Sequence, residues 1–250
     1  MDLGIKGKVA LVMGASKGIG RGVAEALARE GATVAVSSRS GERLEQLVGE
    51  LGGEARAFPA DTGDLDRMGE LPAEVSEALG PVEILVTNTG GPPPGGTFDN
   101  PREEWEATYR ALVLAPRTLV EAALPSMRER GWGRIVNVAS SSVKEPIPSL
   151  ALSNAHRMAT VGLFKTLSVE VASEGITVNT VATGRFATER LFDTQGSIVA
   201  AEEAAREQVP AGRLGTPEEY GDLVAFLCSE RAAYLTGTVI PLDGGLLRSV

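Results

Sequence analysis

Short apolar segments rich in β-branched residues recur along the chain, and each is followed by a stretch with helical periodicity. The segments span residues 9–14, 33–38, 55–61, 83–88, 134–140, 176–182 and 238–245. Strands that are apolar throughout are typical of a parallel sheet buried on both faces. Because crossovers between parallel strands are right-handed, the pattern predicts a doubly wound α/β sheet of about seven strands with helices on both faces.

The chain is predicted to fold as one domain that spans residues 1–250. It is 43% hydrophobic and 23% charged, a balance that is ordinary for a globular protein with a substantial core. No linker, repeat or low-complexity tract divides it, and the glycine- and proline-rich stretch 90–96 directly follows an expected strand. Residues 185–212 are polar and lack a strand pattern, so we expect a helical lid or insertion there.

Charge and cysteine content limit the partners and the compartment. The net charge of −9 argues against nucleic acid or an anionic membrane as the main partner. Cys228 is the only cysteine and lies in an apolar helical stretch, which favours a buried structural thiol and a reducing compartment. The N-terminal apolar run is too short for a signal peptide, and no stretch approaches the ~18–20 apolar residues of a spanning helix. We therefore expect a soluble cytoplasmic protein.

A glycine-rich turn joins the first expected strand to the first expected helix. Gly14, Gly18 and Gly20 have the spacing G-x-x-x-G-x-G. Glycines allow the backbone to turn tightly and to approach a pyrophosphate, while the helix N-terminus offers free N–H groups. The turn therefore predicts a dinucleotide site, formed by Gly14, Ser16, Lys17, Gly18, Ile19 and Gly20.

The end of the second expected strand indicates which nicotinamide cofactor binds. A site for NAD usually places a carboxylate there for the ribose 2′-hydroxyl, whereas a site for NADP uses cations for the 2′-phosphate. The sequence here is SSRS (37–40), with Arg39 and no acidic residue, and Lys17 adds a second cation in the glycine turn. The pattern favours NADP.

With these features the chain resembles the short-chain dehydrogenase/reductase family, in the branch of ~250 residues that includes the 3-oxoacyl-carrier-protein reductases. The resemblance covers essentially the whole chain and depends on residues 13–20, 60–64, 84–91, 133–142, 175–184 and 212–245. It implies a Rossmann fold, with Asp61 at the adenine edge and Asn88 and Gly90 beside the cofactor. Thr188 would touch the nicotinamide carboxamide or the phosphates, and the subunits would form a homotetramer.

The catalytic positions implied by the resemblance are mostly substituted. The family uses a serine, a tyrosine, a lysine four residues beyond the tyrosine, and an asparagine on a preceding helix. Ser140 matches the serine, but Ser153 stands at the tyrosine position, Arg157 at the lysine position and Leu112 at the asparagine position. A serine hydroxyl is far less acidic than a phenol, and arginine does not shuttle protons at neutral pH. Loss of a general acid typically costs about 10²–10⁴ in rate, so the mechanism is predicted to be atypical.

Other groups are candidates for the missing acid. His156 is the only histidine, and imidazole in general, with a pKa near 6.5, suits proton transfer. A surface or interface role is the alternative. As an alternative to proton transfer, Ser153 and Arg157 together would bind a substrate anion or carbonyl. The catalytic candidates are therefore Ser140, Ser153, His156 and Arg157, and no metal site is predicted.

Three functions are consistent with these residues. The first is an NADP-dependent oxidoreductase that acts on a small carbonyl or alcohol, with water or His156 as the proton source. The second is a non-redox enzyme on the same fold. The third is a catalytically weak NADP-binding protein that acts as a sensor or as a partner subunit of a hetero-oligomer.

Overall fold

The computed structural model describes residues 1–249, in which seven parallel strands form one sheet in the order β3-β2-β1-β4-β5-β6-β7. The strands are β1 (Val9–Met13), β2 (Thr33–Ser37), β3 (Arg56–Ala57), β4 (Val82–Thr87), β5 (Gly133–Val138), β6 (Ile176–Thr183) and β7 (Val239–Leu242). This confirms the predicted parallel sheet. The strand expected over 55–61 is shorter than predicted, because only two of its residues pair with β2 at the sheet edge.

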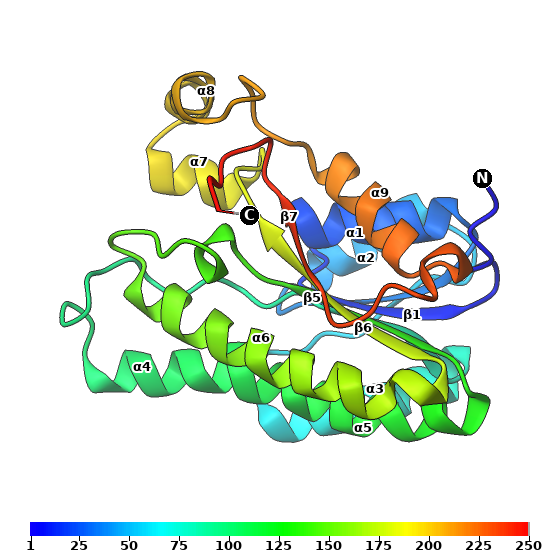
Figure 1. Cartoon of the computed structure of the whole chain (residues 1–250). Coiled ribbons are helices and arrows are strands. Elements are labelled where there is room, and N and C mark those ends of the chain that lie inside the picture. Colours follow the sequence, from blue (N-terminus) through cyan, green and yellow to red (C-terminus); the bar gives the residue numbers. More distant parts are fainter. Residues whose placement is uncertain (250) are drawn as a thin grey trace.

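Helices cover both faces of the sheet (Figure 1). One layer contains α1 (Gly18–Arg29), α2 (Gly41–Leu51) and α9 (Pro217–Leu227), and the other contains α3 (Leu65–Leu79), α4 (Arg102–Tyr109), α5 (Ala115–Arg130) and α6 (Ala151–Val171). Successive side chains of β1 enter opposite layers: Ala10 and Val12 join one core, and Leu11 joins the other. This two-sided burial explains why the strands are apolar throughout.

Two further helices follow β6 and stand apart from both layers (Figure 1). They are α7 (Glu189–Gln195) and α8 (Ile198–Gln208), within the segment 185–212 expected as a helical lid. They pack around a small apolar cluster of their own, made of Ala201, Ala205, Val209 and Leu214. None of the helices described is long and apolar enough to cross a membrane.

Helices α1 and α9 are in backbone contact. A Cβ atom added at Gly22 would lie closer than 3.0 Å to the Pro217 carbonyl oxygen, and one added at Gly221 would lie equally close to the carbonyl of Gly22. Glycine is therefore required at both positions because the neighbouring helix leaves no room for a side chain, and not because of the backbone conformation. Their contact holds α9 against the helix that follows the glycine-rich turn.

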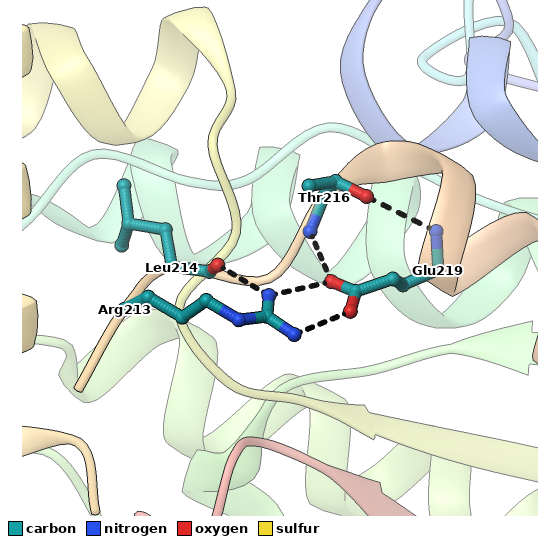
Figure 2. A network of polar contacts seen from close by, with 4 residues as sticks. All are labelled: Arg213, Leu214, Thr216 and Glu219. Carbon is teal, nitrogen blue, oxygen red and sulfur yellow. Dashed lines mark hydrogen bonds and ion pairs between the residues drawn. The ribbon is translucent and has the colours of Figure 1, made fainter. Parts of the chain in front are cut away.

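The start of α9 is fixed by a network of polar contacts (Figure 2). Thr216 Oγ1 accepts from the Glu219 N–H at 3.2 Å, and the Glu219 carboxylate accepts from the Thr216 N–H at 2.9 Å. The Arg213 guanidinium donates to both oxygens of Glu219, at 2.6 and 2.9 Å, and also to the Leu214 carbonyl. Because Leu214 belongs to the cluster under α8, the network joins the segment that contains α7 and α8 to α9.

We predict that Gly22→Ala destabilises the fold. The new methyl group must displace α9, and overpacking of this kind costs about 1–3 kcal/mol in unfolding free energy. The control is Gly49→Ala on the exposed face of α2, where nothing lies within 4 Å of the added Cβ. That substitution should stabilise the protein by about 0.5–1 kcal/mol. Urea unfolding measures both, and equal effects would contradict the contact.

We also predict a pH-dependent contribution from Glu219. The hydrogen bond from Arg213 lowers the pKa of Glu219 from 4.5 to about 2 in the folded state. The carboxylate therefore stabilises the fold fully above pH 4.5, and this stabilisation is lost as the pH falls toward 2. Glu219→Gln should lower the melting temperature at neutral pH and have no effect near pH 2. Glu218 lies in the same turn, but its ion pair with Arg29 is longer, at 3.5 Å. Glu218→Gln should therefore have a smaller effect on the melting temperature at neutral pH.

Candidate functional site

The candidate site lies at the carboxyl ends of the strands, where the strand order reverses between β1 and β4. Ligands of open α/β sheets bind in the crevice at such a reversal. The glycine-rich turn follows β1 and Asn88 follows β4, so the two flank the crevice. The Asn88 side chain donates to the Gly14 carbonyl at 3.3 Å, which joins the two strand ends directly.

The glycine-rich turn forms a close backbone cradle. Gly14 has φ +61°, and a Cβ there would lie 2.5 Å from the Asn88 carbonyl oxygen. A Cβ at Gly20 would lie closer than 3.0 Å to the Gly14 carbonyl. Gly18 has φ +55° and begins α1, while Ile19 is half-buried against the core. The turn therefore leaves the N–H groups of the first turn of α1 open to an anion, which fits a dinucleotide pyrophosphate.

The structure places the two predicted phosphate-binding cations differently. Lys17 follows the half-buried Ser16 and contacts Glu189 of α7 at 2.5 Å. The same carboxylate lies 3.4 Å from Arg43 of α2, a cation that the sequence did not single out. Hydrogen bonding from Lys17 lowers the pKa of Glu189. Arg39 is exposed after β2 and forms no ion pair within residues 1–249.

Three more predicted cofactor residues follow the carboxyl ends of strands β3, β4 and β6. Asp61 is exposed after β3, and its carboxylate accepts from the Gly63 N–H at 2.9 Å. Thr188 caps α7 by accepting from the Leu191 N–H at 3.3 Å. Its methyl group lies over the glycine-rich turn, 3.2 Å from where a Gly18 Cβ would be. Gly90, the third, is exposed near the start of the loop after β4.

Ser140 lies just beyond β5 with its hydroxyl oriented by the backbone. Its Oγ accepts from the Ser142 N–H at 3.1 Å, which leaves the hydroxyl hydrogen free to donate. Ser153 on α6 is 7% exposed, and within the described residues its hydroxyl forms no hydrogen bond. Both predicted serines therefore keep a donor available.

Arg157 joins the ends of two central strands. Its guanidinium donates to the Val138 carbonyl of β5 at 2.8 Å and to the Gly90 carbonyl after β4 at 3.4 Å. Burial, followed by repulsion from Arg190, lowers the pKa of Arg157 to about 10. The side chain therefore stays protonated at neutral pH. With five N–H donors and two carbonyl partners, it retains donors for a ligand.

His156 faces a different neighbour from Arg157. Its ring is 8% exposed and packs against α4, with its centroid 5.3 Å from that of Trp105 and 6.2 Å from that of Tyr109. Nδ1 lies 2.7 Å from the Leu152 carbonyl oxygen. Because a carbonyl only accepts, Nδ1 carries the hydrogen. The ring is thus part of an interface between two helices of the same chain, not beside the Arg157 guanidinium.

The position expected for a family asparagine lies in a π-helical segment, Arg110–Leu114, between α4 and α5. Leu112 is buried there, and its carbonyl accepts from the Thr160 hydroxyl at 2.6 Å. π-Helical turns are frequent at functional sites. Here the segment presents an apolar side chain and a backbone carbonyl already bound to α6.

Sequence reasoning missed two contacts at the crevice. Arg190 of α7 donates to the carbonyls of Gly91 and Pro92, at 2.9 and 3.1 Å. The buried Tyr220 hydroxyl forms a 2.9 Å hydrogen bond with Thr183 at the end of β6, and burial raises the pKa of Tyr220. No local spacing signals either contact, because both join distant segments. Within residues 1–249, no cluster of acidic, cysteine or histidine side chains gathers as a metal site.

We predict that the neutral ring of His156 carries its hydrogen on Nδ1. The Leu152 carbonyl stabilises this tautomer over the more usual Nε2 form. Long-range ¹H–¹⁵N correlation spectra of histidine-labelled protein measure the tautomer directly, and the single histidine needs no assignment. A dominant Nε2–H form would show that the ring does not donate to Leu152.

Comparison with known proteins gives consistent results along the whole chain. A family model described as enoyl-(acyl carrier protein) reductase matches residues 14–247. Human dehydrogenase/reductase SDR family member 4 is 36% identical over 245 residues, which cover 95% of this chain and 87% of that protein. The 2,3-dihydro-2,3-dihydroxybenzoate dehydrogenase of Bacillus subtilis is 34% identical over 252 residues and 97% of both chains.

Solved structures also match along nearly the whole chain. L-Sorbose reductase from Gluconobacter frateurii, complexed with NADPH and L-sorbose, matches with a TM-score of 0.94 and 31% identity over 100% of both chains. A 3-oxoacyl (acyl-carrier-protein) reductase from Agrobacterium tumefaciens with NADP bound matches with a TM-score of 0.92 and 28% identity, over 98% of this chain and 96% of that chain. The chain belongs to the short-chain dehydrogenase/reductase family.

Proposed function

We propose that the protein is an NADP-dependent oxidoreductase that interconverts a carbonyl and an alcohol on a small molecule. The observation that carries this proposal is the intact glycine cradle at the same carboxyl edge of the sheet as Ser140, whose hydroxyl hydrogen is free to donate. Related proteins support it, since the sorbose reductase and the oxoacyl reductase carry NADPH and NADP. The proton step differs from that of the family, because Ser153 and Arg157 replace its acid and its lysine.

The proposed cofactor site uses the cradle for the pyrophosphate and the nearby cations for the 2′-phosphate. Backbone N–H groups at the start of α1 bind the anion, and Lys17 and Arg39 remain the proposed phosphate ligands. Bound NADPH supplies the hydride that reduces the carbonyl carbon. The proposed binding residues are Gly14, Ser16, Lys17, Gly18, Ile19, Gly20, Arg39, Asp61, Asn88, Gly90, Arg157 and Thr188.

The chain's own residues polarise the substrate and retain charge near it. We place Ser140 as the donor to the carbonyl oxygen, with Ser153 as a second hydroxyl. Arg157 holds ribose hydroxyls with the donors that its two carbonyl partners leave free. Because the His156 ring is turned to α4, water is favoured as the source of the proton that completes the alcohol.

A second candidate is a catalytically weak NADP-binding protein, a sensor or a partner subunit. It is favoured by the absence of a phenol and an ammonium group at positions 153 and 157. For the oxidoreductase we propose a homotetramer, and for either function a location in the cytoplasm. The compartment is inferred from Cys228, whose thiol is fully buried and whose pKa burial raises to about 12.

The decisive experiment is a fluorescence titration with NADPH and NADH, followed by turnover of a carbonyl panel. We expect tighter binding of NADPH and measurable turnover. Ser140→Ala should lower kcat about 10²–10³-fold, as expected for loss of one donor to the reacting oxygen. Ser141→Ala is the control, because it removes an adjacent hydroxyl and leaves the Ser142 N–H in place.

Other results would change the conclusion. Tight NADPH binding without turnover of any carbonyl would favour the sensor or partner subunit. Failure to bind either nucleotide would contradict the cofactor site itself. Conversion of a substrate without any change in the nucleotide's absorbance would indicate a non-redox enzyme.

A further inference from the structure

Two arginines from different helices meet the same short loop after β4. Arg157 of α6 donates to the Gly90 carbonyl at 3.4 Å, and Arg190 of α7 donates to the next two carbonyls, those of Gly91 and Pro92, at 2.9 and 3.1 Å. Because their acceptors are three consecutive carbonyls, the two guanidinium groups lie near each other at the carboxyl edge of the sheet. Repulsion from Arg190 contributes to the lowered pKa of Arg157.

Neither arginine has an acidic partner within residues 1–249. In the described part of the chain both guanidinium groups donate hydrogen bonds to carbonyl oxygens alone, whereas other arginines, such as Arg21 and Arg213, form ion pairs. Glu189 adjoins Arg190 in sequence, but its carboxylate is held by Lys17 and Arg43. Two neighbouring cations, one of them half-buried, are unfavourable unless an anion compensates them.

The position of Arg190 is set by the shape of the loop. A Cβ at Gly91 would lie closer than 3.0 Å to the Arg190 guanidinium, so the planar group rests directly on the glycine backbone. Arg190 is nevertheless exposed, so part of its side chain stays accessible to a ligand. A planar guanidinium held in this way presents free N–H donors in the geometry that carboxylate and phosphate groups accept.

We propose that the substrate carries a carboxylate or phosphate group, and that Arg190, with Arg157 beside it, binds this group at the mouth of the crevice. The inference rests on the proposed function, since it names the substrate class of the same site. The pyrophosphate of the cofactor is another anion of similar chemistry. The glycine cradle already offers that group a site, so we assign the Arg190 guanidinium to the substrate, while Arg157 adds its positive charge and keeps its hydrogen bonds for the ribose.

The test compares matched anionic and neutral carbonyl compounds with NADPH as the reductant. Pyruvate, acetoacetate and levulinate are each paired with their methyl esters, and dihydroxyacetone phosphate is paired with dihydroxyacetone. We expect wild-type protein to prefer the anionic member of at least one pair. Arg190→Gln should lower kcat/KM for that anion roughly 10- to 100-fold, the loss expected for hydrogen bonds to a charged group. The neutral partner should be unaffected.

Three further variants separate this role from general effects. Arg190→Lys keeps the charge but lacks the planar fork, and should recover part of the preference. Gly91→Ala displaces the guanidinium without altering Arg190, and should reduce the preference in the same direction. Arg206→Gln removes one exposed positive charge from α8 and should leave the preference unchanged.

Binding of the same anions to NADP⁺-loaded protein is measured by calorimetry, which does not depend on turnover. If no carbonyl reacts but the anions bind and Arg190→Gln abolishes binding, the oxidoreductase proposal fails and the anion site stands. Turnover with equal kcat/KM for charged and neutral partners overturns the anion site alone, as does failure of every anion to bind. If Arg190→Gln weakens NADPH binding and lowers kcat/KM equally for the anionic and the neutral compound, Arg190 serves the cofactor. That result would overturn the inference.

Discussion

The structure depends on the close packing of helix α1 against two other backbone segments, the glycine-rich turn on one side and the start of α9 on the other. At its first turn, Gly20 faces the Gly14 carbonyl, and half a turn later Gly22 faces the Pro217 carbonyl. Neither place admits a side chain. The contacts fix the axis of α1 relative to the end of β1 and to α9 at once. The position of the free N–H groups in the crevice is therefore set by the same helix packing that builds one layer of the core.

The parallel sheet and the glycine turn were predictable because their signals are local. A strand buried on both faces is apolar along its length, and a tight turn requires glycines at fixed spacing. The edge strand was predicted too long, since pairing with a single neighbour needs only Arg56 and Ala57. The contact of Arg190 with Gly91 spans 99 positions, and no periodicity or spacing encodes it.

The orientation of His156 shows the same limit within one helix. Helical geometry places it near the edge of the face that carries Ser153, which is compatible with a place in the crevice or in an interface. The choice is made by Trp105 and by the Leu152 carbonyl, which hold the ring against α4. Arg157, one position further, is directed instead to the ends of β4 and β5. Tertiary neighbours, not helical position alone, decide which side chains reach the site.

The ion pair between Lys17 and Glu189 joins the glycine-rich turn to the first residue of α7, across 172 positions of the chain. Both side chains are about half exposed, at 46% and 55%, so water and salt screen the attraction and the pair contributes little stability. The contact between the glycine-rich turn and α7 is therefore weak. Raising the ionic strength should consequently weaken this contact more than it weakens the buried core that holds the two sides of the sheet together.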